Sequence, residues 1–229
     1  MIDGILIIDK ESGITSYDVI RKLKRIFDKG QKIGHAGTLD PFATGLLIIL
    51  LGKATKMMNT FHTYEKTYLV EGELGYCTDT QDREGKVIKK DETKITPSRD
   101  EIETIIEENF MGDITQIPPS YSAKKVEGKK AYDLAREGKE LTLKPVNISI
   151  SQFEVYEYEY PMLKCKIKCS TGTYIRTLIH DLGIKLGTYA TTKELRRITI
   201  GSFDVSEAVL SKDICIENKE NILRRVIKI

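Results

Sequence analysis

The chain has 229 residues, of which 40% are hydrophobic, and its charges nearly balance at a net +2. This length allows one large domain or two small ones, with enough apolar residues for a sizeable core. No apolar run approaches the roughly 20 residues needed to cross a bilayer, and no secretory signal is evident at the N-terminus. The four cysteines lack the paired spacing of a zinc ribbon, so we expect reduced thiols and a cytoplasmic protein.

The hydrophobic pattern predicts a mixture of strands and helices along the chain. A capping Thr15 or Ser16 begins an amphipathic helix that Gly30 ends. The expected strands are 5–8, 46–51, 67–75, 146–158 and 162–170, and the expected helices are 16–30, 54–61, 98–110, 131–137 and 173–186. Residues 76–85 read as a loop. Long strands with separated helices favour an α+β fold whose sheet is largely antiparallel.

Asp40 lies in the segment Gly34-His-Ala-Gly-Thr-Leu-Asp-Pro-Phe-Ala-Thr-Gly45. Pro41 biases Asp40 toward extended backbone, so the carboxylate is expected on a loop. The glycines permit backbone conformations and close approaches that other residues resist. Taken alone, such a segment is more typical of a surface turn.

Basic residues gather in one stretch of an otherwise balanced chain. Residues 121–145 hold seven bases and four acids, whereas residues 91–113 hold eight acids and two bases. The basic stretch could follow phosphates while acidic surface elsewhere offsets it. A solvated charged loop is the alternative explanation.

Four segments together resemble the TruB family of tRNA pseudouridine synthases. They are the Asp40 segment, Lys66-Thr-Tyr-Leu-Val70, Pro119-Ser-Tyr-Ser-Ala-Lys124 with Gly128-Lys-Lys-Ala-Tyr132, and Gly172-Thr-Tyr-Ile-Arg-Thr-Leu178 with Leu195-Arg-Arg197. They stand in the family's order and cover residues from about 4 to about 208. The resemblance implies a pseudouridine-synthase fold, with a central mixed sheet, flanking helices and an RNA-binding cleft.

The resemblance also implies the activity, which is conversion of uridine to pseudouridine at position 55 in the T-loop of tRNA. The bond from uracil N1 to ribose C1′ breaks, the base turns, and a bond from C5 to C1′ forms. This isomerisation is redox-neutral, so we expect no cofactor and no metal. The sequence contains no Walker, Rossmann or HExxH motif, in agreement with that expectation.

Three residues match the family's catalytic positions. Asp40 is the carboxylate expected to attack C1′ or to stabilise positive charge there while a proton leaves C2′. Arg176, near the start of the predicted helix 173–186, is expected to keep Asp40 ionised and oriented. Tyr68 is placed against the target uracil, where its ring can stack and its phenol can take part in proton transfer.

Further residues match positions that bind the RNA. His35 is expected beside the flipped nucleotide, Tyr174 and Leu195 in the uracil pocket, and Lys56 on a phosphate. Contacts to the RNA backbone are expected from Lys124, Lys125, Lys129, Lys130, Arg196 and Arg197. His62 and His180 have no such match and are expected to be structural.

Three other functions fit parts of the sequence. Guide-dependent relatives that modify ribosomal RNA share the Asp40 motif, but 77–82 and 179–183 look more like the stand-alone bacterial type. A non-catalytic RNA-binding module would not need Asp40, Tyr68 and Arg176 together. A two-carboxylate glycosidase would need a second acid at the position where the family places Arg176.

The end of the sequence differs from many TruB-like chains, which continue into a small PUA-type RNA-binding domain. Residues 206–229 are too few for an independent domain, so we expect one catalytic domain with a short C-terminal tail. The expected partner is then the T-arm of tRNA, bound by a monomer without a protein partner. On this basis an isolated T-arm hairpin is expected to be as good a substrate as whole tRNA.

Overall fold

The computed structural model describes residues 1–229 apart from 123–124, 127–128 and 131–142. The predicted helix at 131–137 lies outside the described residues. The chain forms two compact units: unit 1 consists of residues 1–69 and 195–229, and unit 2 consists of residues 70–194. Strands β4 (Lys66–Leu74) and β12 (Ala190–Ile200) each carry the chain across this division.

Unit 1 is built on a mixed sheet. Strand β1 (Gly4–Lys10) pairs antiparallel with β3 (Thr44–Leu51) and parallel with β14 (Val209–Leu210). Strand β3 also pairs antiparallel with β2 (Ile33–Ala36) and parallel with β12, where Arg197 stands opposite Gly45. The short strand β13 (Phe203–Asp204) pairs antiparallel with β12.

Alternation along β1 and β3 divides the apolar side chains of unit 1 between two cores. Leu6, Ile8, Leu47, Ile49 and Leu51 pack with helix α1 (Ser16–Ile26) and helix α6 (Lys219–Arg224). On the opposite face, the intervening residues pack with the 3₁₀ helix η1 (Gly52–Met57), helix α2 (Met58–His62) and Phe203. Because both faces are covered, β3 is a continuous apolar run, as the sequence predicts for residues 46–51.

Helix α1 begins where its sequence predicts. Thr15 Oγ1 accepts a hydrogen bond from the Asp18 amide, and the Asp18 carboxylate accepts one from the Thr15 amide, which forms a capping box. The buried residues Val19, Ile20, Leu23 and Ile26 recur at helical spacing and form the face that contacts the sheet. The helix ends at Ile26, a few residues before the expected stop at Gly30.

Residues 206–229, expected to be a short tail, form part of unit 1. They contain β14, the 3₁₀ helix η3 (Ser211–Asp213) and α6, and the side chains of Ile214 and Ile222 are buried in the α1 core. The Ile5 and Ile227 backbones exchange two hydrogen bonds of 2.8 Å. The 3₁₀ helix η2 (Val205–Glu207) leads into this segment.

Unit 2 contains a largely antiparallel sheet with the strand order β4-β11-β10-β7. Strands β10 (Val146–Glu159) and β11 (Met162–Cys169) form the predicted antiparallel pair, and β7 (Gly112–Gln116) lies beside β10. Cys165 and Cys169 are both fully buried on one face of β11, as their spacing predicts. All four cysteines are free thiols.

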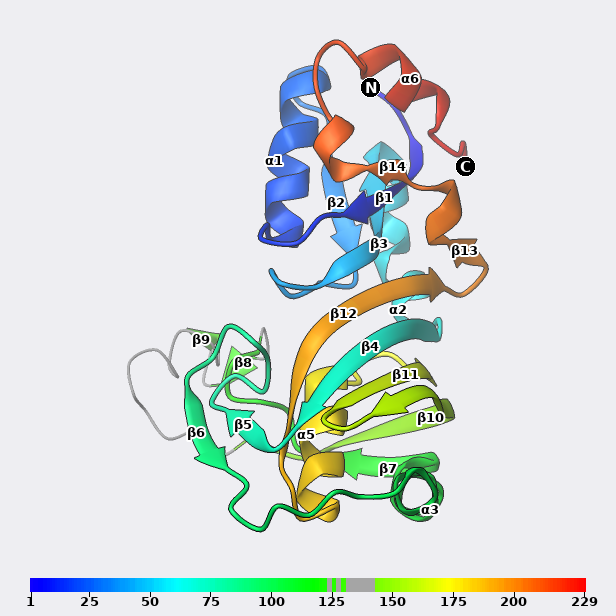
Figure 1. The fold of residues 1–229 in the computed structure, drawn as a ribbon. Coiled ribbons are helices and arrows are strands. Elements are labelled where there is room, and N and C mark those ends of the chain that lie inside the picture. Colours follow the sequence, from blue (N-terminus) through cyan, green and yellow to red (C-terminus); the bar gives the residue numbers. More distant parts are fainter. Residues whose placement is uncertain (123–124, 127–128, 131–142) are drawn as a thin grey trace. The chain divides into compact units, whose positions relative to one another are not determined.

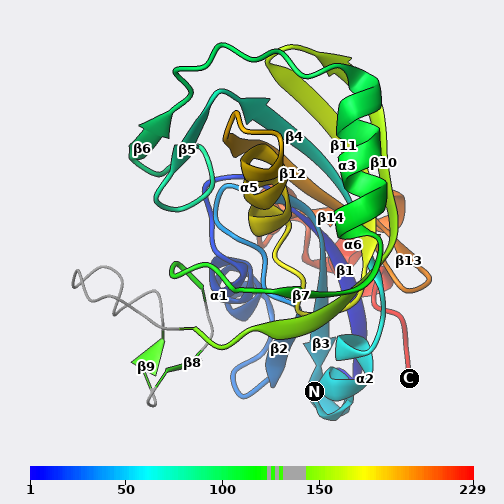
Figure 2. The same cartoon turned by 90° about the horizontal axis from the view of Figure 1, so that it is seen from below.

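Two helices flank this sheet. Helix α3 (Arg99–Phe110) begins at the predicted cap Ser98, runs along β10, and stacks Phe110 edge-on against Phe153 (Figure 2). Helix α5 (Ile175–Lys185) follows β11, and Gly183 lets it approach Ala190 at the start of β12. The structure is therefore α+β, as the sequence predicts.

Three features of unit 2 differ from the sequence interpretation or add to it. Residues 76–78, expected in a loop, form β5 (Tyr76–Thr78), which pairs with β6 (Val87–Lys90). Strands β7 and β12 have no counterpart among the expected elements. The two-residue strands β8 (Lys125–Val126) and β9 (Lys129–Lys130) pair with each other. In the described part of the chain, no helix is both long and apolar enough to cross a membrane.

Candidate functional site

The loop that carries Asp40 joins β2 to β3 in unit 1 (Figure 1). Its apolar side chains point inward: Leu39, Phe42 and Ala43 are at most 4% exposed. Asp40 is half-buried between them, and Pro41 is exposed. The local sequence explains this conformation, since Pro41 excludes helix at Asp40 and the flanking apolar residues hold the loop to the core.

Hydrogen bonds from the β1–α1 segment hold the middle of the loop. The Leu39 amide donates to Ser16 Oγ at 2.9 Å, and Ser12 Oγ donates to the Phe42 carbonyl at 2.8 Å. The Pro41 carbonyl accepts from the Gly13 amide at 2.9 Å and from Lys10 Nζ at 3.1 Å. The backbone on both sides of Asp40 is therefore fixed by residues far away in sequence.

Lys10 is a fully buried cation beneath this loop. Its ammonium also donates to the carbonyls of Glu11 and Ile14, both at 2.8 Å. Burial lowers the pKa of Lys10 to about 8, and the negative charge of Asp40 partly opposes this shift. Lys10 was absent from the sequence-based site because its strand position gives no local signal of a buried charge.

Arg197 fixes the two ends of the same loop. It is 2% exposed and donates from Nε to the Leu46 carbonyl at 2.8 Å and from Nη2 to the Gly37 carbonyl at 2.9 Å. Nη1 lies 3.5 Å from the Thr38 carbonyl. This burial differs from the expected contact with RNA phosphate, because the guanidinium has no exposed surface to offer.

His35 lies on β2, opposite Ile49 of β3. Its side chain is half-buried, and its buried Nδ1 has no hydrogen-bond partner among the described residues. Burial lowers the pKa of His35, and the nearby positive charge of Arg197 lowers it further. The imidazole is therefore held neutral at physiological pH, in the form that can stack or fill an apolar space.

In unit 2, Arg176 is the second residue of α5 and is 3% exposed. Its Nη1 forms an ion pair with Asp82 Oδ2 at 3.1 Å and donates to the Thr80 carbonyl at 2.5 Å. Its Nη2 donates to the Tyr121 carbonyl at 3.0 Å. A planar fork of donors is what such divergent acceptors require. The expected pairing with Asp40 stays a prediction.

Asp82 is a residue that the sequence analysis missed. It is 5% exposed, and its Oδ1 accepts from Thr80 Oγ1 at 2.7 Å and from the Glu84 amide at 3.0 Å. The Asp82 backbone also forms an isolated parallel β-bridge with Thr192 of β12. The dense run of Asp and Thr at 78–82 was the available signal, since short polar side chains that bond to nearby backbone shape such loops.

The expected uracil-pocket residues occupy ordered positions. Tyr68 on β4 is 8% exposed, and Leu195 on β12 is 5% exposed. Tyr174 is the N-cap of α5: its amide donates to Gln116 Oε1 at 2.9 Å, and its carbonyl accepts from Gln116 Nε2 at 3.0 Å. Gln116 thus attaches the start of α5, including Arg176, to β7.

The residues expected to contact phosphate have different surroundings. Lys56 is exposed on η1. Arg196 is half-buried and binds both carboxylate oxygens of Asp9, at 2.9 and 2.6 Å. Lys125 lies on β8, and Lys129 and Lys130 lie on β9. Lys124 lies outside the described residues.

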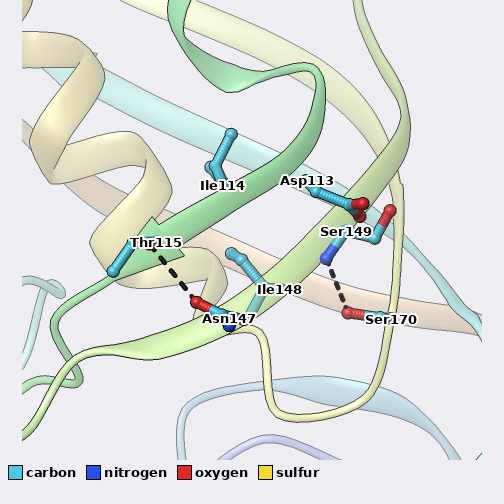
Figure 3. Close-up of a pocket in the computed structure, with 7 residues that line it drawn as sticks. All are labelled: Asp113, Ile114, Thr115, Asn147, Ile148, Ser149 and Ser170. Carbon is cyan, nitrogen blue, oxygen red and sulfur yellow. Dashed lines mark hydrogen bonds between the residues drawn. The ribbon is translucent and has the colours of Figure 1, made fainter.

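A shallow hollow of about 480 Å³ lies against the paired strands β7 and β10 in unit 2 (Figure 3). Within it, Thr115 Oγ1 lies 3.4 Å from Asn147 Oδ1, and the Ser149 amide donates to Ser170 Oγ at 2.9 Å. Its other lining residues are Asp113, Ile114 and Ile148. None of these residues was singled out for chemistry, and these two hydrogen bonds join four of the polar residues. Over the described ranges of the chain, no group of three or more His, Cys, Asp or Glu residues could hold a metal ion.

The sequence matches known families over nearly its whole length. Residues 24–175 match the TruB family pseudouridylate synthase (N terminal domain), and residues 176–228 match the tRNA pseudouridylate synthase B C-terminal domain. The tRNA pseudouridine synthase B of Endomicrobium trichonymphae is 45% identical over 226 residues, which are 99% of this chain and 96% of that relative. Its counterpart from Clostridium acetobutylicum is 43% identical over 227 residues, 99% of this chain and 76% of that relative.

Solved structures share the fold. A chain in the crystal structure of a Cbf5-Nop10-Gar1 complex superposes with a TM-score of 0.70 at 29% identity, over 92% of this chain and 53% of that one. A chain in the structure of an H/ACA RNP bound to a substrate RNA containing 2′-deoxyuridine gives a TM-score of 0.70 at 26% identity, over 98% and 58%. The present chain therefore spans a little over half the length of these two solved chains.

Proposed function

Because the chain belongs to the TruB family of pseudouridine synthases, we propose that it converts uridine 55 in the T-loop of tRNA to pseudouridine. The observation that carries this proposal is the Asp40 loop, which holds a half-buried carboxylate on a backbone fixed from several sides. Such a loop suits a reaction that needs one carboxylate in a set position and no redox partner. The curated relatives at 45% and 43% identity are named as tRNA enzymes, which favours tRNA over the RNA of the guide-dependent complexes.

The chemistry assigns a role to each catalytic residue. Asp40 faces C1′ of the flipped nucleotide while the N1–C1′ bond breaks, and it supplies the negative charge that the developing sugar cation needs. The detached uracil turns and bonds through C5 to C1′, after which the proton on C5 leaves and N1, now free of the ribose, takes up a proton. Both routes, covalent attack by Asp40 and loss of a proton from C2′, are consistent with this placement.

The other residues hold the reactants in place. Arg176 presents a positive charge whose direction is fixed by Asp82 and by two backbone carbonyls, and we assign it to the orientation of Asp40. Tyr68 stacks on the uracil, and Leu195 and Tyr174 complete its pocket. His35, held neutral by burial and by Arg197, fills the space that the flipped base leaves.

Binding rests on contacts to the phosphate backbone of the T-arm. We assign these contacts to Lys56, Arg196 and the lysines Lys124, Lys125, Lys129 and Lys130. The proposal includes action as a monomer in the cytoplasm, on tRNA and without a protein partner. The phosphate contacts are tested by the dependence of RNA affinity on salt concentration, whose slope is expected to fall with each lysine removed.

The deciding experiment compares the parent chain with Asp40→Asn on a T-arm transcript, with a matched transcript that carries cytidine at position 55 as the substrate control. The parent is expected to form pseudouridine at position 55 only, and the variant is expected to bind RNA with nearly unchanged affinity and to form none. Residual turnover of the variant within about tenfold of the parent would remove Asp40 from the catalytic role. Modification of ribosomal RNA in place of tRNA would instead favour the function of the guide-dependent relatives.

A further inference from the structure

Arg197 is the largest fully buried side chain of the described structure. Its three guanidinium nitrogens reach the carbonyls of Gly37 and Thr38, where the Asp40 loop begins, and of Leu46, just after it ends. One planar group therefore joins the two ends of the loop that carries Asp40. A lysine has a single donor centre and cannot span acceptors that diverge in this way.

Stability alone does not explain a buried arginine here. Burying a cation costs free energy unless it is paired, and an apolar side chain of similar volume often stabilises a core better. In the described part of the chain no carboxylate forms an ion pair with Arg197, and its acceptors are backbone carbonyls. What the buried guanidinium provides is a fixed geometry for the Asp40 loop.

Two glycines of the Asp40 segment, Gly37 and Gly45, lie against Arg197. A Cβ on Gly37 would lie 3.3 Å from Arg197 Nη1, and the φ angle there is +84°. A Cβ on Gly45 would lie 2.2 Å from the Arg197 carbonyl oxygen, at a φ angle of +104°. Glycine is favoured at both ends of the loop because both φ angles are positive, and at Gly45 the Arg197 backbone also occupies the space that a side chain would take.

Lys10 complements this arrangement at the middle of the loop. Its ammonium binds the Pro41 carbonyl in the middle of the loop, next to Asp40 itself. Lys10 therefore supports the residue after the carboxylate, whereas Arg197 sets the distance between the two ends. The conformation at Asp40 depends on both, but only Arg197 closes the loop.

We propose that Arg197 is a positioning residue, which sets the catalytic placement of Asp40 by holding the carbonyls at both ends of its loop. This inference rests on the proposed role of Asp40. A shift of about 1 Å in a catalytic group can lower a rate by about 100-fold without loss of substrate binding. Loss of the Arg197 fork is therefore expected to act on the rate and not on the affinity.

The test uses the full chain with Arg197→Lys, which keeps the positive charge and loses the fork. Leu23→Ala is the control, because Leu23 is fully buried on α1 and lowers stability without contacting the loop. For Arg197→Lys, the single-turnover rate on saturating T-arm RNA is expected to fall about 100-fold, with the dissociation constant within about threefold of the parent. Leu23→Ala is expected to keep the single-turnover rate and the dissociation constant within about threefold of the parent, even where its melting temperature falls as much as that of Arg197→Lys.

Hydrogen exchange of the peptide 37–45 supplies a second readout that needs no activity. It is expected to speed up in Arg197→Lys and to stay unchanged in Leu23→Ala. Should Arg197→Lys fail to fold, Arg197→Gln makes the same test, because its shorter side chain keeps a single amide donor group and cannot join the carbonyls at both ends of the loop.

The outcomes distinguish a failure of the proposed function from a failure of the positioning role of Arg197. A parent chain that forms no pseudouridine overturns the proposed function and with it the catalytic purpose of Arg197. If the parent is active, three results would overturn the positioning role alone. They are an Arg197→Lys variant as fast as the parent, unchanged hydrogen exchange of its loop, and a Leu23→Ala variant that loses as much rate. Loss of rate with preserved affinity and faster loop exchange supports it.

Discussion

Replacing Asp181 by Asn is expected to stabilise the protein at neutral pH. Asp181 lies on α5 and lines a small cavity with Asn109, Phe110, Gln116 and Leu178. Burial raises its pKa from 3.8 to about 6, and Lys185 only partly opposes the shift. The ionised carboxylate is thus disfavoured in the folded protein, and an amide of the same shape has no charge to desolvate.

The size of the effect follows from the two pKa values. A difference of about 2 pKa units corresponds to about 3 kcal/mol at about 1.4 kcal/mol per unit. Since the folded protein binds the proton more tightly, this stabilising contribution is complete below the unfolded pKa of 3.8 and is lost as the pH rises through about 6. Asp181→Asn should therefore raise the free energy of unfolding by about 2–3 kcal/mol at pH 7.5 and by almost nothing near pH 4.

Urea unfolding at several pH values measures this difference. Glu107→Gln is the matched control, because Glu107 is exposed on α3 in the same unit. Its effect on the free energy of unfolding is expected to stay below about 0.5 kcal/mol across the range. An Asp181→Asn variant that is destabilised at pH 7.5, or equally affected at pH 4 and 7.5, would refute the reasoning from burial.

Other perturbations test the site more directly. Arg176→Lys should lower the single-turnover rate strongly with little change in RNA affinity, because lysine cannot reach Asp82 and two carbonyls together; an unaffected rate would remove Arg176 from the orientation of Asp40. Gly45→Ala should lower the free energy of unfolding by about 1–3 kcal/mol, since its φ angle is +104° and its Cβ meets the Arg197 backbone; urea unfolding that matches the parent would contradict this. Activity on pre-folded RNA should survive exhaustive chelation, because the isomerisation is redox-neutral, and specific rescue by one divalent ion would argue the opposite.

Much of the local structure follows from the sequence alone. The capping residues Thr15 and Ser98 mark the starts of α1 and α3, because their side chains bond to amides within one turn. The alternation at 146–158 and 162–170 predicts the β10–β11 pair, since one face is apolar and the connection is short. The Asp40 segment likewise identifies its own loop, because proline and glycine restrict the backbone at that position.

Local patterns were less informative where pairing is distant. Strand β12 was not expected, although it pairs with β3 and carries both Arg196 and Arg197. Its residues mix polar and apolar types, and the reason for their burial is a partner strand about 150 positions earlier, as the separation of 151 residues between Arg197 and Leu46 illustrates. Residues 76–78 appeared to be a loop for a different reason, since β5 has only three residues and pairs with the neighbouring strand β6 beyond a polar turn.

The sequence by itself determined the reaction that this protein is proposed to catalyse, because Asp40 and its neighbours form a contiguous segment with its own chemical signature. The tertiary structure decided how the charged residues are used. Arg197, expected on RNA phosphate, is buried beneath the Asp40 loop, and Asp82, unremarked in sequence, pairs with Arg176 across 94 positions. Burial and hydrogen-bond geometry assign these roles, and both depend on contacts between distant segments that no local pattern contains.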